Sequence, residues 1–294
     1  MQREITQEMA KDRLPRREAD ANKGSFGSVL AAAGSMAYRG AAALCTEGAL
    51  RAGAGLVYLA SVEPVVQMVL TRTPECCACG CRTANGGIHP QDAGALRSWF
   101  DGKNTVLLAG PGLGESAAPV CNALLGKKAP WSAAVLDADA LNALAAGKIK
   151  GPLPDQTVIT PHPGEAARLL DCTVGEVQAD REAAARRLAG MYHCIAVLKG
   201  RGTLIATPGG EVYHNPTGSA GLAKGGSGDI LAGLLSGLLA AGLKQGRTAE
   251  DAAIAAVWLH GAAGDRCAKR LGMAAMLPHD IFADLGAIFA ELER

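Results

Sequence analysis

Short apolar runs of strand length alternate with longer Ala- and Leu-rich runs along most of this chain. A sheet whose strands alternate with helices is mainly parallel, because right-handed crossovers place the helices on its two faces. The pattern therefore predicts an α/β fold with three layers, helices on both faces of a central sheet. We expect strands at 29–34, 55–61, 75–82, 105–110, 133–138, 157–160 and 195–200, and helices at 40–52, 116–126, 175–190, 228–242, 249–269 and 279–293, with a short helix after residue 138.

Two further strands follow without a helix between them. Residues 203–207 and 211–215 are joined through Pro208-Gly209-Gly210, which is typical of a hairpin. The sequence contains no repeat, low-complexity tract or linker, so we expect residues 1–294 to form one domain, although 294 residues would also suffice for two.

Charge and hydropathy exclude several classes of protein. Lys and Arg number 29 against 28 Asp and Glu, and 49% of the residues are hydrophobic, so neither disorder nor a broad basic surface for nucleic acid or an anionic membrane is expected. The most apolar run, 230–243, is shorter than the roughly 18 residues of a membrane span. The charged N-terminal segment lacks a signal-type apolar stretch, which predicts a cytoplasmic protein.

Nine cysteines cannot all pair internally, and four of them gather at Cys76, Cys77, Cys79 and Cys81. One hypothesis is a zinc site. The other is a strand carrying small buried thiols, which the spacing favours, because alternate strand residues lie about 7 Å apart and thiolates on one zinc about 4 Å apart.

Polar residues follow several of the apolar strands directly, in segments 108–114, 135–144, 158–165 and 197–203. Ligands in parallel α/β sheets bind at the carboxyl ends of the strands. These four junctions therefore predict a polar, glycine-lined cleft at one edge of the sheet.

Familiar nucleotide and hydrolase motifs are missing. There is no GxxxxGK[ST] and no HExxH, GPGLGE (110–115) has Glu115 at the third glycine position of the dinucleotide fingerprint, and GGSGD (225–229) does not fit GxSxG. A Walker ATPase, a simple dehydrogenase, an α/β-hydrolase and a zincin all lose support.

The segment 215–243 instead runs from a glycine-rich loop straight into an apolar helix. Gly225, Gly226, Ser227 and Gly228 would let backbone N–H groups converge at the positive end of the helix as an anion hole. Asp229 beside them is either a helix cap or a base that takes a proton from an attacking hydroxyl while the loop holds the transferring phosphoryl group.

GGSGD before an apolar helix resembles the signature loop of the ribokinase-like superfamily. In TPHPGEA (160–166), His162 stands where sugar kinases of that superfamily have Asn, and Glu165 matches their Glu. A closer resemblance, over nearly the whole chain, is to the NAD(P)H-hydrate dehydratases. It rests on segments 14–35, 39–60, 110–114, 135–144, 160–170, 197–206, 225–229 and 258–265, in that order.

This resemblance implies a repair reaction. Hydrated NADH or NADPH (NADHX, NADPHX) is phosphorylated on its ring hydroxyl by ADP or ATP with Mg²⁺, and loss of phosphate restores the reduced cofactor. We expect ADP rather than ATP, a homo-oligomer, and an epimerase for the hydrated cofactor on another chain. Two alternatives stay open, a kinase of a vitamin precursor from the same superfamily and a non-catalytic nucleotide-binding regulator.

The resemblance also assigns roles to residues. Asp229 is the expected catalytic base and contacts the substrate together with Ala41, Gly112, Gly114 and His162. Glu165 and Asp139 are expected to act indirectly on Mg²⁺. The expected nucleotide-binding residues are Lys199, Gly200, Arg201, Gly202, Thr203 and Gly228.

Each of these roles has a simpler structural alternative. His162 could be a solvated turn residue, Lys199 could extend to solvent, and Asp139 could cap a helix. Trp258 and His260 are expected in the core of the 249–269 helix and outside the site.

Two residues depart from the family pattern. Ser219 replaces an Asn, and Lys224 before the glycines is expected either to contact a phosphate or to face water.

Overall fold

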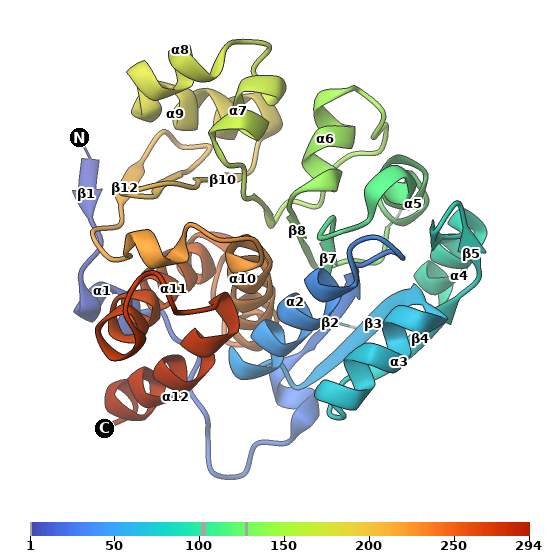
Figure 1. Ribbon diagram of the computed structural model, residues 1–294, viewed down its shortest axis with the longest axis horizontal. Helices are drawn as coiled ribbons and strands as arrows, with labels where there is room; N and C mark the ends of the chain where they lie inside the picture. The colour runs from blue at the N-terminus through green and yellow to red at the C-terminus, as the bar shows by residue number, and fades with distance from the viewer. Residues whose placement is uncertain (1, 101–103, 127–128) are drawn as a thin grey trace.

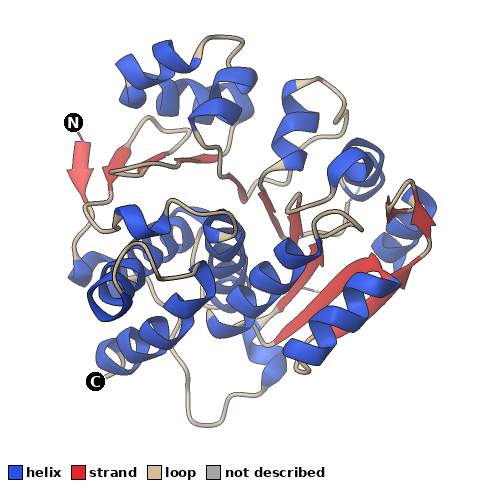
Figure 2. Cartoon of the chain, in the orientation of Figure 1, coloured by secondary structure: helices blue, strands red, loops and turns tan. Residues whose placement is uncertain are grey.

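A ten-stranded sheet runs through the computed structural model, which describes residues 2–100, 104–126 and 129–294 (Figures 1 and 2). The strands lie in the order β1-β12-β11-β10-β9-β8-β7-β2-β3-β4. Their bounds are Gln2–Glu4 (β1), Ser28–Ala32 (β2), Leu56–Val62 (β3), Cys77–Cys81 (β4), Thr105–Ala109 (β7), Ala133–Leu136 (β8), Thr157–Ile159 (β9), Ile195–Leu198 (β10), Leu204–Ala206 (β11) and Val212–His214 (β12). A separate small hairpin pairs β5 (Thr83–Ala84) with β6 (Gly87–Ile88).

All strand pairs of this sheet are parallel except those made by β11, which runs antiparallel to β10 and β12. In the centre, Val29 on β2 is in register with Val57 on β3 and Val106 on β7. The six central strands β10, β9, β8, β7, β2 and β3 thus end at one edge of the sheet, where ligand sites are expected.

Helices cover both faces of the sheet (Figure 1). One face packs against α1 (Gln7–Asp12), α2 (Arg39–Arg51), α3 (Glu63–Arg72), α10 (Ser227–Leu243), α11 (Ala249–Leu271) and α12 (Ile281–Leu292). The other packs against α4 (Pro90–Phe100), α5 (Ala117–Leu124), α6 (Asp139–Ala145), α7 (Pro163–Leu169), α8 (Val174–Ala179) and α9 (Arg181–Tyr192). The predicted three-layer arrangement with a mainly parallel sheet is confirmed.

Helices α10 and α2 touch backbone to backbone. A Cβ added at Gly233 would lie 2.2 Å from the carbonyl oxygen of Cys45, and one added at Gly237 would lie 2.3 Å from that of Ala49. Glycine at these two positions is therefore required by the close approach, which brings the start of α2 beside the start of α10.

The expected strands and the 203–215 hairpin are confirmed. The three helices expected after residue 227 are also present, and each of their ends lies within two residues of its predicted position. The single helix expected at 175–190 is wrong, because the chain breaks at Asp180, whose side chain accepts from the N–H of Ala183 and starts α9. The structure also contains β1, α1, α3, α4 and α7, which the sequence analysis did not predict.

The cysteine cluster lies on and beside the edge strand β4, as the strand reading predicted. Cys76, Cys79 and Cys81 are buried, and burial raises the pKa of Cys76 and Cys81 to about 12. These thiols are protonated at neutral pH. Among the described residues, no helix is both long and apolar enough to span a bilayer.

Candidate active site

A cavity of about 940 Å³ opens where the carboxyl ends of β8, β9 and β10 meet the start of α10. It has the size of a site for a drug-sized ligand or larger. The structure brings together here most of the site residues predicted from sequence, namely His162, Glu165, Lys199, Gly200, Arg201, Gly202, Thr203, Gly225, Gly226, Ser227, Gly228 and Asp229.

The predicted anion loop forms one wall of this cavity. Gly226 is the N-cap of α10 with a φ of +101°, a conformation that favours glycine, and it turns the chain so that α10 begins at Ser227. The first N–H groups of this 17-residue helix have no intrahelical partner, and together with the helix dipole they provide an anion-binding end.

Asp229 lies in the first turn of α10, not at its cap. The N-cap is Gly226, which makes no side-chain cap bond, so the capping interpretation of Asp229 is wrong. Burial and, to a smaller extent, the charge of Asp137 raise the pKa of Asp229 to about 7, although Lys199 opposes the shift. A carboxylate with this pKa is suited to take up a proton near neutral pH.

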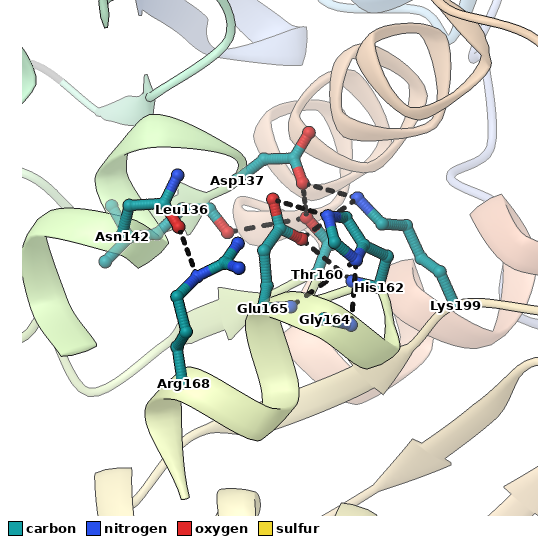
Figure 3. A network of polar contacts seen from close by, with 9 residues as sticks. All are labelled: Leu136, Asp137, Asn142, Thr160, His162, Gly164, Glu165, Arg168 and Lys199. Atoms are coloured by element: carbon teal, nitrogen blue, oxygen red, sulfur yellow. Dashed lines mark hydrogen bonds and ion pairs between the residues drawn. The ribbon is translucent and has the colours of Figure 1, made fainter. Parts of the chain in front are cut away.

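Asp137, directly after β8, was not among the predicted site residues, yet it lies at the centre of a buried polar network (Figure 3). Its Oδ1 accepts from Lys199 Nζ at 2.7 Å and from Thr160 Oγ1 at 2.8 Å. Burial lowers the pKa of Lys199, but attraction to Asp137 and Glu165 outweighs this and raises it. Lys199 is therefore a paired cation inside the site and does not extend to solvent.

Glu165 and His162 form a capping box at the start of α7. His162 Nδ1 accepts from the N–H of Gly164 at 2.9 Å, and Glu165 Oε2 accepts from the N–H of His162 at 2.8 Å (Figure 3). Because Nδ1 is an acceptor, the neutral ring carries its proton on Nε2, which lies 3.5 Å from Glu165 Oε1. His162 is thus a helix cap as well as part of the cavity wall.

Glu165 is 5% exposed, and Lys199 Nζ lies 3.9 Å from its Oε2. Burial raises the pKa of Glu165, while Lys199 opposes the rise.

The segment 199–203, in which nucleotide binding is expected, is held by Arg181, a residue that the sequence analysis missed. Its guanidinium donates to the carbonyl oxygens of Leu198 at 3.1 Å, Lys199 at 3.3 Å and Arg201 at 2.5 Å. Gly200 fits over it, since a Cβ there would lie 3.0 Å from Arg181 Nη2. The sequence offered no signal, because an arginine at the first position of a helix is usually a surface residue.

The predicted substrate positions Ala41, Gly112 and Gly114 do not line this cavity. Ala41 and Gly112 are neighbours, because a Cβ on Gly112 would lie 3.0 Å from that of Ala41. Asp139, proposed for Mg²⁺, also lies outside the lining, and its Oδ2 accepts from the N–H of Gly114 at 2.8 Å. It opens α6 at the residue after the cap, Ala138, so it does not cap that helix.

The charge of Asp139 nevertheless contributes to the raised pKa of Asp229. Asp139, whose Oδ2 holds the N–H of Gly114, therefore lies close enough to Asp229 to act on its charge.

The two residues that depart from the family pattern both stabilise the loop before the glycines. Ser219 caps a short 3-10 turn, its Oγ accepting from the N–H of Gly221. Lys224 is half-buried in the cavity wall, and its Nζ donates to the carbonyl oxygens of Ala274 at 2.7 Å and Met276 at 2.6 Å. Both bonds fix the backbone from which the anion loop starts.

Trp258 and His260 are buried on α11, as predicted, but His260 also lines the cavity and was wrongly left out of the site.

The acidic side chains of the cavity suit Mg²⁺ bound in the way typical of phosphoryl-transfer sites, through one or two carboxylates, water and phosphate. Asp137 and Glu165 pair with one cation, Lys199, whose charge also acts on Asp229, and Asp137 Oδ2 makes no hydrogen bond to any residue in the described part of the chain. No group of three His, Cys, Asp or Glu residues in the described ranges forms a ready-made metal site. The residues thus fit a cation that phosphate helps to hold.

Comparison with known proteins agrees with this geometry. The sequence model of the NAD(P)H-hydrate dehydratase family matches residues 29–286. The chain belongs to the NAD(P)H-hydrate dehydratase family. It is 38% identical to the ADP-dependent (S)-NAD(P)H-hydrate dehydratase of Neisseria meningitidis, an alignment that covers 89% of this chain and 84% of that protein.

It is also 40% identical to a bifunctional NAD(P)H-hydrate repair enzyme of Moorella thermoacetica, over 99% of this chain but 54% of that protein. The chain spans about half the length of the bifunctional relatives that it matches. Among solved structures, the ADP/ATP-dependent NAD(P)H-hydrate dehydratase of Bacillus subtilis, co-crystallised with ATP and Mg²⁺, has a TM-score of 0.83 and 31% identity, with 99% of both chains covered. The fold of the family is therefore present over the whole chain.

Membership in this family removes the basis for the vitamin-kinase alternative, which rested on the wider superfamily.

Proposed function

We propose that this protein dehydrates NADHX and NADPHX to NADH and NADPH, with ADP as the favoured co-substrate. The observation that carries the proposal is the position of Asp229, a half-buried carboxylate with a pKa near 7 beside a glycine anion loop in the large cavity. The ADP dependence in the name of the Neisseria relative, and the ATP and Mg²⁺ in the Bacillus structure, support the co-substrates.

In the first step, Asp229 accepts the proton of the ring hydroxyl as the hydroxyl oxygen attacks the terminal phosphorus of the nucleotide. The bond from this phosphorus to the bridging oxygen breaks, and the N–H groups of Gly226 and Gly228 stabilise the charge on the transferring group. A poor leaving group, hydroxyl, is thereby replaced by a good one, phosphate.

In the second step, the ring nitrogen donates its electron pair, the bond between carbon and phosphate oxygen breaks, and loss of a proton from the neighbouring ring carbon restores the double bond. The protein's main task is thus phosphoryl transfer.

Mg²⁺, when bound, neutralises charge on the nucleotide phosphates. We assign it to Asp137 and Glu165, which line the cavity together, in place of the pair Glu165 and Asp139 expected from sequence. Asp139 instead holds Gly114, and so shapes the proposed substrate side. Lys199 keeps Asp137 and Glu165 in place before the metal arrives.

The loop 199–203 would bind the AMP portion of the nucleotide, and Ala41, Gly112, Gly114 and His162 the hydrated cofactor. The separate epimerase, the cytoplasmic location and the homo-oligomer stay predictions.

The test is a repair assay. Purified protein is incubated with hydrated NADH, Mg²⁺ and either ADP or ATP, and recovery of reduced-nicotinamide absorbance is followed. We expect recovery with a nucleotide, faster with ADP, and none without one. A folded preparation that restores no absorbance with either nucleotide contradicts the proposal.

The Asp229→Asn variant distinguishes the enzyme from a nucleotide-binding regulator. Loss of a general base lowers the rate by about 10²- to 10⁴-fold while nucleotide affinity is retained. If Asp229→Asn regenerates NADH as fast as the original protein, the base role is wrong.

A further inference from the structure

We propose that His260 is a positioning residue, which orients the Ser227 hydroxyl of the anion loop as a hydrogen-bond donor to the transferring phosphoryl group. The proposal rests on the function proposed above. It adds a side-chain contact to the backbone contacts that the glycine loop makes with the anion. Ser227 makes this contact, and His260 orients it.

The two side chains are in direct contact although 33 residues separate them. Ser227 Oγ lies 3.2 Å from His260 Nε2, and the pair is buried. Both residues also line the cavity, so the contact faces the space where phosphate would bind. Among the described residues, Ser227 Oγ has no other hydrogen-bond partner.

Helix α11 holds His260 firmly against this loop. Gly261 packs directly on Thr217, since a Cβ at Gly261 would lie 2.2 Å from Thr217 Oγ1. Thr217 Oγ1 in turn donates to the carbonyl oxygen of Trp258 at 3.1 Å, and Asp265 Oδ2 accepts from the N–H of Gly218 at 2.9 Å. The helix therefore fixes the start of the 217–229 segment, and His260 on the same helix contacts Ser227 near the end of that segment.

The protonation state of His260 determines which of the two side chains can donate the hydrogen bond between them. Burial and the charge of Lys199 lower its pKa to about 4, against a hydrogen bond with the Ser227 backbone that raises it, so the imidazole is neutral at pH 7 and has one N–H and one lone pair. If Ser227 donated its proton to Nε2, the Oγ lone pairs would face the anion and repel it. If Nε2–H donates to Oγ, the hydroxyl proton is free to point into the cavity.

A phosphate in the loop therefore favours the second arrangement, in which His260 donates to Ser227 and Ser227 donates to phosphate. Hydrogen bonds that are already in place where charge develops stabilise the transition state most. The pair should thus affect kcat more than nucleotide binding.

The experiment is a double-mutant cycle with Ser227→Ala, His260→Leu and the combination of both. Removal of one donor from an anion hole predicts a loss in kcat of about 10- to 100-fold for each single variant, with less than about threefold change in KM for ADP. Because both changes remove the same hydrogen bond, the double variant should lose no more than the worse single variant.

Two controls separate positioning from packing. Ser236→Ala removes another buried hydroxyl of α10, which donates to the carbonyl oxygen of Gly233, and should leave kcat unchanged. His260→Gln keeps an N–H donor and should recover part of the rate that His260→Leu loses. Thermal unfolding of every variant is measured alongside, so that a loss of folded protein is recognised.

Losses that multiply in the double variant, or a Ser227→Ala variant with unchanged kcat, would overturn the proposal. An equal loss in His260→Gln and His260→Leu would do so as well. The original protein, assayed first, tests the repair function itself, whereas the ratios between variants test only the pair.

Discussion

Lys199 Nζ lies 2.7 Å from Asp137 Oδ1 and so joins the carboxyl ends of β8 and β10, which are 62 residues apart in the chain. Asp137 is 1% exposed. Lys199 also lies 3.9 Å from Glu165, so one cation balances two carboxylates while a third, Asp229, stands nearby. This excess of negative charge favours a divalent cation in the cavity, and it adds to the burial that raises the pKa of Asp229.

Replacing Lys199 by Met should destabilise the protein, because a buried carboxylate is left without its partner. The expected loss is about 3 kcal/mol of unfolding free energy, measured by urea denaturation. The double variant Lys199→Met with Asp137→Asn is the control and should recover most of this loss. A single variant as stable as the original protein would show that the pair contributes nothing.

The repair rate should depend on pH through Asp229. Its pKa in the folded protein is about 7, so kcat/KM should fall about tenfold per pH unit below pH 7, as the base becomes protonated. Asp137 is one cause of the raised pKa, so Asp137→Asn should move this limb to lower pH. A limb at the same pH in Asp137→Asn would contradict the assigned coupling.

The same shift predicts the effect of Asp229 on stability. Its pKa is raised from the ordinary 3.8 to about 7, so the folded state binds this proton more tightly than the unfolded state. The stabilisation that this bound proton gives the folded state is complete below pH 3.8 and is lost as the pH rises through about 7. Asp229→Asn should therefore be at least as stable as the original protein at pH 8 in thermal unfolding, and a lower melting temperature there would be contrary evidence.

Arg181 should control nucleotide affinity. It binds three carbonyl oxygens of the segment 198–201, so Arg181→Ala frees this loop and should raise KM for ADP about tenfold while kcat changes little. Arg186→Ala on the same helix, whose guanidinium pairs with Glu182, is the matched control. An equal effect in both variants would indicate a general effect on α9.

Gly233 should tolerate no side chain. A methyl group there would meet the backbone of Cys45, so Gly233→Ala should cost about 1–3 kcal/mol through forced separation of α2 and α10. Gly286 on α12 has no atom within 4 Å of the added Cβ, and Gly286→Ala should stabilise by up to about 1 kcal/mol. Opposite signs in denaturant unfolding confirm the close approach, and equal effects contradict it.

The layers of the fold and most of the cavity could be predicted from sequence because they depend on local signals. Apolar runs mark β2, β3 and β7, and the glycines of 225–228 mark the anion loop. β1 could not be predicted, because three exposed residues have no pattern of their own and become a strand only by pairing with β12.

The site residues that sequence missed act through contacts between distant segments. Asp137 follows β8 in the same motif as Asp139, and only the three-dimensional contacts show which of the two binds Lys199. His260 looked like a core residue and is one, but the approach of α11 to the anion loop also gives it a place in the cavity. Such pairings are set by tertiary packing and leave no periodic trace.

The pairing of β1 with β12 has a consequence for the order of folding. Gln2 is in register with Val212, so this segment is made well before its partner, which follows 210 residues later in the chain. Helix α1 packs on α11, so its packing is also incomplete until Ala249–Leu271 has been made. This edge of the sheet thus cannot close before Val212–His214 has been made, and until then the newly made chain must keep Gln2–Glu4 from pairing with other strand edges.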